Sequence, residues 1–390
     1  MQFSEYGLSE EQRALCASVR ELCARYPEAY WRELDGQSAY PTDFIRALTE
    51  GGYLAAMIPE PYGGMGLGVT EGGLILEEIN RSGGNSAPGH AQMYIMGTLL
   101  RHGSEAQKEA YLPGIAKGQI RLQAFGVTEP DAGLDTTNIS TTAVRRGDRY
   151  LVTGRKVFIS RVQHSDMMLL LCRTTPKEQR TRRTEGLSVL LVDLQQARGH
   201  GLEVRPIETM VNHHTTELTM EEMEVPVENL VGEEGQGFRY ILDSMNAERI
   251  LVASESIGDG RYFIERAVDY ANKRNVFGRP IGQNQGVQFP IARAYAAVEA
   301  ARLMRDRAAD MFDHGENPGQ EANMAKLLGS EAAWLAGNTC MDVHGGYAYA
   351  REFDIERKFR ETRLYMTAPV TNNLVLSYLG QTVLGLPRSF

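Results

Sequence analysis

One acidic side chain attracts attention because it falls where a helix should be apolar. Glu248 lies in the stretch MNAERILVAS, and at about 100° per residue it shares a narrow helical stripe with Ile241, Met245 and Val252. A carboxylate on an apolar stripe is costly unless it is paired or functional, and in a dry pocket its pKa can suit proton abstraction. The alternative interpretations are a salt bridge to a neighbouring basic residue and simple exposure. Glu255 lies on nearly the same stripe, but no motif supports it.

Other sequence patterns that could indicate a catalytic or ligand-binding site lack the neighbouring elements that such sites require. The glycine-rich GGMGLG (residues 63–68) follows no buried strand and lies in no βαβ unit, so we do not expect a dinucleotide fold of Rossmann type. The sequence contains no GxxxxGK(S/T), HExxH or GxSxG motif. His213 and His214 are adjacent but have no nearby cysteine and no spaced carboxylates, so we expect a polar loop and no metal site there.

Composition indicates an ordinary globular protein of two or three domains. The 390 residues are 42% apolar and 23% charged, and the net charge of −9 argues against a nucleic-acid surface and a polybasic membrane anchor. The N-terminus has no cationic region followed by an apolar run, and no run of about 18 apolar residues occurs, so we expect neither a signal peptide nor membrane insertion. The four cysteines form no CxxC pair, which favours thiols in a reducing cytoplasm.

The elements that would position these residues change character twice along the chain. Helical spacing dominates residues 1–120, strand-like runs rich in β-branched residues dominate residues 121–232, and helical spacing returns over residues 233–390. These ranges predict an N-terminal helical domain, a middle β domain and a C-terminal helical bundle. The charged run KEQRTRRTEG (residues 177–186) is interpreted as a solvated hairpin loop.

Four segments occur in order and at characteristic spacings. They are FGVTEPDAGLDT (125–136), GRKVFISRVQHSD (154–166), YANKRNVFGRPIGQNQGVQ (270–288) and DVHGGYAYAREFDIERKFRETR (342–363). Through these segments the chain resembles the acyl-CoA dehydrogenase family over nearly its whole length. The resemblance implies an α+β fold with an N-terminal helical domain, a middle β domain and a C-terminal four-helix bundle.

The resemblance also implies an activity, a cofactor and partners. Members of this family are oxidoreductases that act on a CH–CH group, hold FAD between the β domain and the bundle, and usually form homotetramers. They dehydrogenate an acyl-CoA thioester to the trans-2-enoyl-CoA and pass the electrons to an electron-transferring flavoprotein. The same fold serves flavin reductases, oxidases and monooxygenases, and a non-catalytic protein that binds acyl-CoA and FAD is a third possibility. Glu248 favours the dehydrogenase, because a mere binder has no use for an acid on that stripe.

The resemblance assigns particular residues to the cofactor and the substrate. A flavin needs hydrogen-bond donors near its N1/O2 edge and at N5/O4, because these donors stabilise the reduced, anionic ring. The residues matched to FAD are Phe125, Val127, Thr128, Phe158, Ser160, Arg274, Phe277, Gln285, Asp342, Gly345, Gly346, Thr371 and Asn373. Arg274, Phe277 and Gln285 match residues that reach the FAD of a neighbouring subunit, and the two glycines would let the backbone approach it closely. Leu134 and Arg249 are matched to the substrate.

The stretch YMTAPVTNNL (365–374) departs from the commonest pattern of the family. Many relatives carry the catalytic Glu where this chain has Pro369, whereas the long-chain and isovaleryl-type members carry it immediately before an Arg on an earlier helix. Glu248-Arg249 matches that second arrangement, so the resemblance assigns the base to Glu248.

Pro369 also lacks the backbone N–H that helps to polarise the thioester carbonyl in the family. Either a one-residue shift brings another amide to that place, or polarisation relies on the ribityl hydroxyl of FAD. We further expect Pro369 to open the last helix of the bundle, since proline is tolerated in a first turn.

Overall fold

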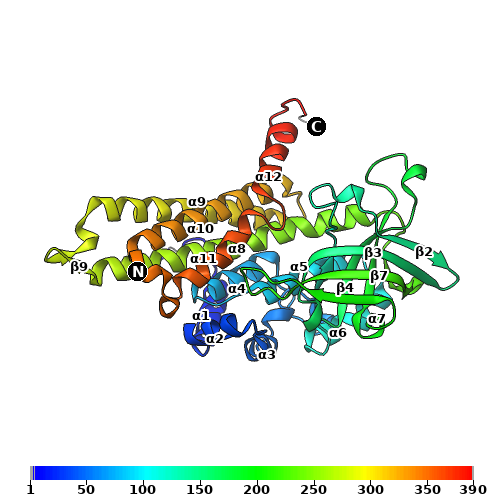
Figure 1. Ribbon diagram of the computed structural model, residues 1–390, viewed down its shortest axis with the longest axis horizontal. Coiled ribbons are helices and arrows are strands. Elements are labelled where there is room, and N and C mark those ends of the chain that lie inside the picture. The colour runs from blue at the N-terminus through cyan, green and yellow to red at the C-terminus, as the bar shows by residue number, and fades with distance from the viewer. Residues whose placement is uncertain (1–2, 4, 389–390) are drawn as a thin grey trace. The chain divides into compact units, whose positions relative to one another are not determined.

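The computed structural model describes Phe3 and residues 5–388 and contains helices, then strands, then helices along the chain (Figure 1). The predicted order of a helical N-terminal region, a middle β region and a helical C-terminal region is therefore confirmed. Close contacts divide the chain into two compact units. Unit 1 comprises Met1–Phe44, Leu67–Ser86 and Asn246–Phe390, and unit 2 comprises Ile45–Gly66 and Ala87–Met245.

Unit 2 is built on an eight-stranded sheet. In sheet order the strands are β6 (Leu202–Pro206), β7 (Thr215–Pro226), β3 (Arg149–Ser160), β2 (Thr142–Arg146), β4 (Met167–Arg173), β5 (Leu187–Asp193) and β8 (Leu230–Val231), and β1 (Leu122–Gly126) pairs in parallel with β4. The pairing of β3 with β7 is antiparallel and shifts register between Lys156 and Ile159. This shift marks a β-bulge, a feature that re-aims side chains at the edge of a ladder.

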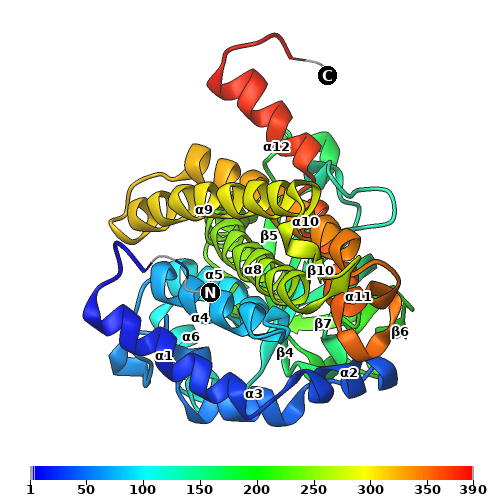
Figure 2. The ribbon, with the colours of Figure 1, turned by 90° about the vertical axis from the view of Figure 1, so that its left-hand side faces the viewer.

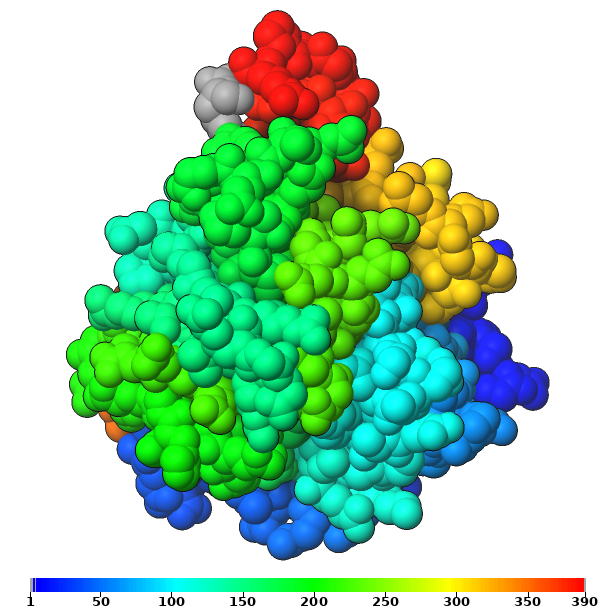
Figure 3. Space-filling view, turned by 90° about the vertical axis from the view of Figure 1, so that its right-hand side faces the viewer, coloured from blue at the N-terminus to red at the C-terminus, as the bar shows by residue number. Residues whose placement is uncertain are grey.

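Strand β4 is buried on both faces of the sheet. Its residues alternate between two apolar cores, with Met167, Leu169 and Leu171 in one and Met168, Leu170 and Cys172 in the other. The first core includes residues of α5 (Ala87–His102) and α6 (Glu105–Ala116), so these helices cover that face. A strand packed on both sides reads as a continuous apolar run, which explains the sequence MMLLLC. On the face seen in Figure 3, most of the cyan to green surface belongs to this unit, and its first segment, Ile45–Gly66, has the blue colour of the bar.

Unit 1 is helical. Its helices are α1 (Glu10–Ala24), α2 (Glu28–Gln37), α4 (Val69–Arg81), α9 (Gln285–Asp313), α10 (Gly319–His344), α11 (Ile355–Arg363) and α12 (Asn372–Tyr378), with most of α8 (Gly237–Lys273) and the start of α3 (Thr42–Glu50). Figures 1 and 2 show α8, α9 and α10 as neighbours. Their close approach needs small residues, since a Cβ added to Gly260 of α8 would lie 2.6 Å from the side chain of Val298 on α9. None of the helices in the described chain is both long and apolar enough to cross a membrane.

The C-terminal helix begins later than predicted. Pro369 lies in a bend after a cis Ala368–Pro369 peptide bond, and α12 begins at Asn372. The prediction that Pro369 opens this helix is wrong, because the helix begins three residues later, where Thr371 serves as its N-cap. Thr371 is the N-cap, and its hydroxyl accepts a hydrogen bond from the Leu374 N–H at 3.3 Å.

Candidate functional site

A buried lysine organises the loop that follows β1 in unit 2. Lys156 of β3 is fully buried, and its Nζ donates to the Val127 carbonyl and to Glu129 Oε1, both at 2.9 Å. Glu129 also accepts hydrogen bonds from the backbone N–H groups of Ser140 and Thr141. Burial alone would raise the pKa of Glu129, but Lys156 and these hydrogen bonds lower it to about 2. The carboxylate therefore stays ionised and holds both ends of the loop.

The same arrangement leaves two backbone donors for a ligand. Lys156 occupies the Val127 carbonyl, and the Val157 N–H donates to the Thr128 carbonyl at 2.9 Å. Within the described chain, neither the Val127 N–H nor the Thr128 N–H donates a hydrogen bond, and the Ser160 hydroxyl has no partner. Hydrogen-bond donors of this kind are what the edge of a flavin requires, so these residues fit FAD.

The other predicted ligand residues of unit 2 lie nearby in sequence but in different environments. Phe158 sits at the β-bulge with φ of 60° and is 64% exposed, which leaves its ring open to a partner. Phe125 is partly buried against the first core and contacts the Tyr94 ring at a centroid distance of 6.0 Å. Leu134 is 57% exposed on the loop after Glu129.

In unit 1 the predicted base is buried. Glu248 lies on α8 with 8% of its surface exposed, and the neighbouring Arg249 is partly buried. Arg249 donates to Asn246 Oδ1 at 3.1 Å, and its Nε is buried without a partner in the described chain. Burial lowers the pKa of Arg249, while Glu248 and Tyr378 of α12 oppose that effect. Arg249 therefore lies close enough to Glu248 and to Tyr378, at the end of α12, to interact electrostatically with both.

A second buried lysine anchors the segment after Pro369. Lys326 of α10 is fully buried, and its Nζ donates to the Val370 carbonyl at 2.7 Å and to Asn372 Oδ1 at 2.6 Å. Burial and the nearby Arg249 lower the pKa of Lys326 to about 8. The structure thus brings the Glu248–Arg249 pair, Lys326 and the YMTAPVTNNL stretch to one place within unit 1.

Lys326 and Asn372 were not among the site residues predicted from the sequence. A signal was present in α10, where Lys326 stands between Ala325 and Leu327 in a run whose neighbours are almost all small or apolar. Of the residues that were predicted here, Thr371 uses its hydroxyl to cap α12, and Asn373 is exposed.

The remaining predicted cofactor residues lie on an exposed part of unit 1, at the end of α8, the start of α9 and the end of α10. They are Arg274, Phe277, Gln285, Asp342, Gly345 and Gly346, all exposed. The Tyr270 and His344 rings lie 4.2 Å apart, and the Arg274 guanidinium lies 6.0 Å from the Tyr347 ring, which brings the ends of α8 and α10 together.

Gly345 has φ of 58°, a left-handed conformation that glycine adopts without strain. A Cβ at Gly345 or Gly346 would meet no atom within 4 Å, so the backbone there is open to a ligand. Phe277 is fully exposed. These features suit a surface that meets a cofactor, as the resemblance implies.

Glu255, the alternative acid on α8, belongs to a polar cluster instead. It is 2% exposed, and its carboxylate accepts a hydrogen bond from the Ser86 hydroxyl at 2.6 Å. Asn80 donates to the Glu255 carbonyl at 3.2 Å and to the Tyr365 hydroxyl at 2.8 Å. These contacts give Glu255 a structural role that needs no substrate.

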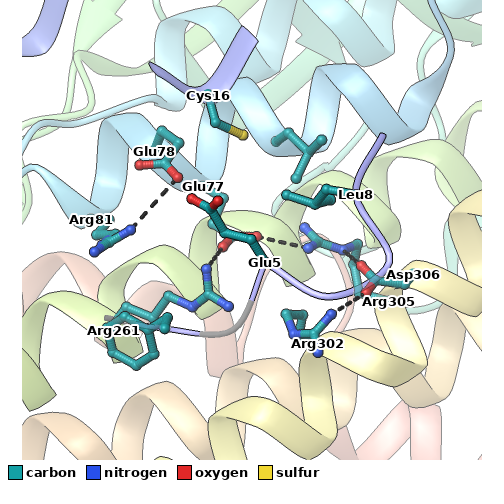
Figure 4. A pocket seen from close by; sticks show the side chains of 12 residues that line it. Glu5, Leu8, Cys16, Glu77, Glu78, Arg81, Arg261, Arg302, Arg305 and Asp306 are labelled. Atoms are coloured by element: carbon teal, nitrogen blue, oxygen red, sulfur yellow. Dashed lines mark hydrogen bonds and ion pairs between the residues drawn. The ribbon is translucent and has the colours of Figure 1, made fainter. Parts of the chain in front are cut away.

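A separate polar cavity in unit 1 is lined by ion pairs (Figure 4). It has a volume of about 20 Å³, room for about one water molecule. Glu77, at its wall, is ion-paired with Arg261 and with Arg305, the latter at 2.7 Å. Burial would raise the pKa of Glu77, but these two arginines lower it. The cavity is therefore better explained as a buried salt-bridge network than as a reaction centre.

The adjacent histidines lie on the loop before β7. His213 Nδ1 is 3.3 Å from Arg161 Nη1, and His214 Nδ1 is 3.3 Å from His164 Nε2. Burial and the neighbouring His214 and Arg161 lower the pKa of His164 to about 4. Over the described residues, no group of three His, Cys, Asp or Glu side chains is placed to hold a metal ion.

Comparison with known families matches three models to this chain. They are described as the N-terminal domain of acyl-CoA dehydrogenase, over residues 9–119, the middle domain, over residues 124–223, and the C-terminal domain, over residues 235–383. An acyl-CoA dehydrogenase of Mycobacterium bovis, fadE12, is 33% identical over 385 residues, which is 98% of each chain.

Solved structures are similar over the same extent. Glutaryl-coenzyme A dehydrogenase in complex with glutaryl-CoA is 30% identical, has a TM-score of 0.90 and covers 100% of this chain and 98% of its own. The prolyl acyl carrier protein oxidase AnaB is 25% identical, has a TM-score of 0.91 and covers 97% of this chain and 100% of its own.

Proposed function

Because this chain belongs to the acyl-CoA dehydrogenase family of FAD-dependent oxidoreductases, we propose that it dehydrogenates an acyl-CoA thioester between its α and β carbons. The product is the trans-2-enoyl-CoA, and the electrons pass to an electron-transferring flavoprotein. The observation that carries the proposal is Glu248, a buried carboxylate on α8 beside Arg249 and the segment that follows Pro369.

The chemistry divides among a few groups. FAD, when bound, supplies the acceptor for the hydride that leaves the β carbon. A Glu248 carboxylate oxygen takes the α-proton, and its burial keeps water from competing for that role. The Val127 and Thr128 N–H groups and the Ser160 hydroxyl would hold the edge of the flavin by hydrogen bonds, and the exposed Phe158 ring would pack against the cofactor. Arg249 lies next to the base and contacts the substrate.

Assembly and surroundings are proposed on the same basis. Arg274, Phe277 and Gln285 are exposed on unit 1, which supports a role toward the FAD of a neighbouring subunit in a homotetramer. Phe125, Asp342, Gly345, Gly346 and Asn373 are assigned to FAD, and Leu134 to the substrate, whereas the hydroxyl of Thr371, a residue also matched to FAD in the sequence, caps α12 instead. The three domains are assigned to residues 1–120, 121–232 and 233–390. The four cysteines are free thiols, which supports a cytoplasmic enzyme.

The test is anaerobic mixing of the purified flavoprotein with acyl-CoAs of graded length and branching, followed by flavin absorbance. We expect one class of acyl-CoA to bleach the flavin rapidly. Glu248→Gln should retain FAD but lose bleaching by about two to four orders of magnitude in rate. Glu255→Gln is the matched control, since it alters another buried acid of α8, and it should still bleach. Bleaching by Glu248→Gln at the parental rate would overturn the assignment of the base.

A second candidate is an oxidase that acts on a carrier-bound thioester. The structural similarity to prolyl acyl carrier protein oxidase, with a TM-score of 0.91, supports this alternative. It predicts no bleaching by any acyl-CoA and fast reoxidation by oxygen after chemical reduction. A dehydrogenase should reoxidise slowly in air when no flavoprotein acceptor is present.

A further inference from the structure

Lys326 is a cation held in the interior without a carboxylate partner. It is fully buried, and no carboxylate of the described chain lies within ion-pair distance of its Nζ. Its two acceptors are the Val370 carbonyl at 2.7 Å and Asn372 Oδ1 at 2.6 Å. Burying an ammonium group without a compensating charge costs stability, and these two hydrogen bonds offset only part of that cost.

The Val370–Thr371 peptide unit is oriented by this lysine. A trans peptide is planar, and its C=O and N–H bonds point in opposite directions. Because the Val370 carbonyl points at Lys326 Nζ, the Thr371 N–H points away from it. Thr371 is fixed on its other side as well, since its hydroxyl and its carbonyl both accept from the Leu374 N–H in the first turn of α12. The Thr371 N–H itself donates to no acceptor in the described chain.

Unit 2 contains a related arrangement, in which the buried lysine also pairs with Glu129. There the fully buried Lys156 donates to the Val127 carbonyl at 2.9 Å, and the N–H of the same peptide unit, that of Thr128, is left without an acceptor. In both places a buried ammonium binds a carbonyl whose peptide partner lies at a predicted ligand position. A hydrogen bond from a charged donor polarises the peptide and strengthens its N–H as a donor.

The N–H of Thr371 matters because Pro369, two residues earlier, has no backbone N–H. We propose that Lys326 is a positioning residue that presents the Thr371 N–H to the thioester carbonyl in place of the amide missing at Pro369. The proposal rests on the proposed function. It differs from the one-residue shift that the sequence left open, because the amide that takes over lies two residues after Pro369, and it also differs from polarisation by the ribityl hydroxyl alone. One oxyanion donor is typically worth about 10²- to 10³-fold in rate.

The structure offers a direct way to delete that N–H. Thr371 has φ of −66° and ψ of 149°, values that proline adopts without strain. Thr371→Pro therefore removes the N–H together with the hydroxyl cap, whereas the matched control Thr371→Ala removes only the cap. Lys326→Met removes the ammonium group and keeps a side chain of similar length. Ser330→Ala removes a hydroxyl that contacts Asn372 but not the Val370 carbonyl, and it controls for general loosening of the segment.

The experiment is isotope-edited infrared spectroscopy of the FAD-saturated protein with bound 2-enoyl-CoA labelled with ¹³C at the thioester carbonyl. The parent, Thr371→Ala and Ser330→Ala should show the C=O stretch shifted to lower wavenumber than in water. Thr371→Pro should lose most of this shift, and Lys326→Met a large part of it. Stopped-flow flavin reduction by the matching acyl-CoA should slow by about 10²-fold or more in Thr371→Pro relative to Thr371→Ala.

The outcomes separate the two proposals. A parental shift and a parental reduction rate in Thr371→Pro would overturn the role of this amide while leaving the dehydrogenase intact. Loss of the shift in Thr371→Pro but not in Lys326→Met would overturn the role of Lys326. If the parent neither shifts the carbonyl band nor is reduced by any acyl-CoA, both this inference and the proposed function are refuted. Should Lys326→Met fail to fold, the comparison of Thr371→Pro with Thr371→Ala still decides whether the amide acts.

Discussion

Replacing Lys156 by methionine tests the buried ion pair that shapes the loop after β1. In the parent, Lys156 and Glu129 are 0% and 3% exposed at their side chains and pair at 2.9 Å. The substitution leaves the Glu129 carboxylate buried with its backbone hydrogen bonds but without a cation. It also releases the Val127 carbonyl, so the Thr128 N–H is no longer held in place.

The size of the effect follows from the pKa of Glu129. A fall from 4.5 to about 2 corresponds to about 3 kcal/mol of stabilisation of the ionised form, at about 1.4 kcal/mol per pKa unit. Breaking a buried ion pair by removing one partner typically costs about 3–5 kcal/mol. We therefore expect Lys156→Met to lower the free energy of unfolding by about 3 kcal/mol at pH 7.

The dependence on pH has a definite sign. Because the folded-state pKa of Glu129 is depressed, its stabilisation is complete above pH 4.5 and is lost as the pH falls toward 2. The difference between parent and Lys156→Met should therefore shrink in acid. Adding Glu129→Gln to Lys156→Met should recover part of the loss, because it removes the uncompensated charge.

The assay is urea unfolding followed by circular dichroism, with FAD titration of each variant. Lys177→Met is the control, because Lys177 also donates to a backbone carbonyl, that of Asn138 at 2.9 Å, but on the exposed surface. It should change stability by less than about 0.5 kcal/mol. FAD binding should weaken in Lys156→Met and not in Lys177→Met. Equal unfolding midpoints for the parent and Lys156→Met, or no recovery in the double variant, would refute the reasoning.

Two further predictions concern buried titratable groups. Burial and the neighbouring Glu77 raise the pKa of Glu78 from 4.5 to about 7, so stability contributed by the protonated form is lost as the pH rises through that interval. Glu78→Gln should raise the free energy of unfolding by about 2–3 kcal/mol at pH 8.5 and hardly at pH 4, and an equal gain at both pH values would contradict this. Burial raises the pKa of Cys16 to about 12, of Cys23 to about 11 and of Cys172 to about 12, and raises that of Cys340 as well. A thiol reagent at pH 8 should therefore detect less than one thiol per native chain and four after unfolding, whereas fewer than four would indicate a disulfide.

Much of the fold and part of the site could be predicted from local patterns. The spacing of apolar residues changes after residue 120 from about 3.6 residues to 2 residues. This change marks the start of the strands, because side chains on one face of a helix recur every 3.6 residues and those on one face of a strand every second residue. The motif around Val127 and Thr128 identified a loop in which the N–H groups of these two residues are left without acceptors in the described chain. The apolar stripe of α8 singled out Glu248, which is buried.

The errors and omissions arise where contacts are distant in sequence. Pro369 was predicted to open the last helix, but the helix starts only at Asn372, because Thr371 supplies the cap. Lys326 was not predicted at all, since the carbonyl that it binds lies 44 residues further along the chain. No periodicity within a helix reveals such a partner, and an isolated lysine in a helix is ordinarily taken for a surface residue.

The sequence by itself determined the family, the succession of helices and strands, and the acid most suited to take a proton, because motif spacing and side-chain periodicity are local properties. Only the tertiary structure decided which backbone groups are left over for a ligand. Lys156 and Lys326 each occupy a carbonyl and leave the N–H of the same peptide without an acceptor, and this depends on chain segments meeting in space. The absence of an amide at Pro369 is visible in the sequence, but its replacement by the Thr371 amide is inferred from the way Lys326 holds the Val370–Thr371 peptide.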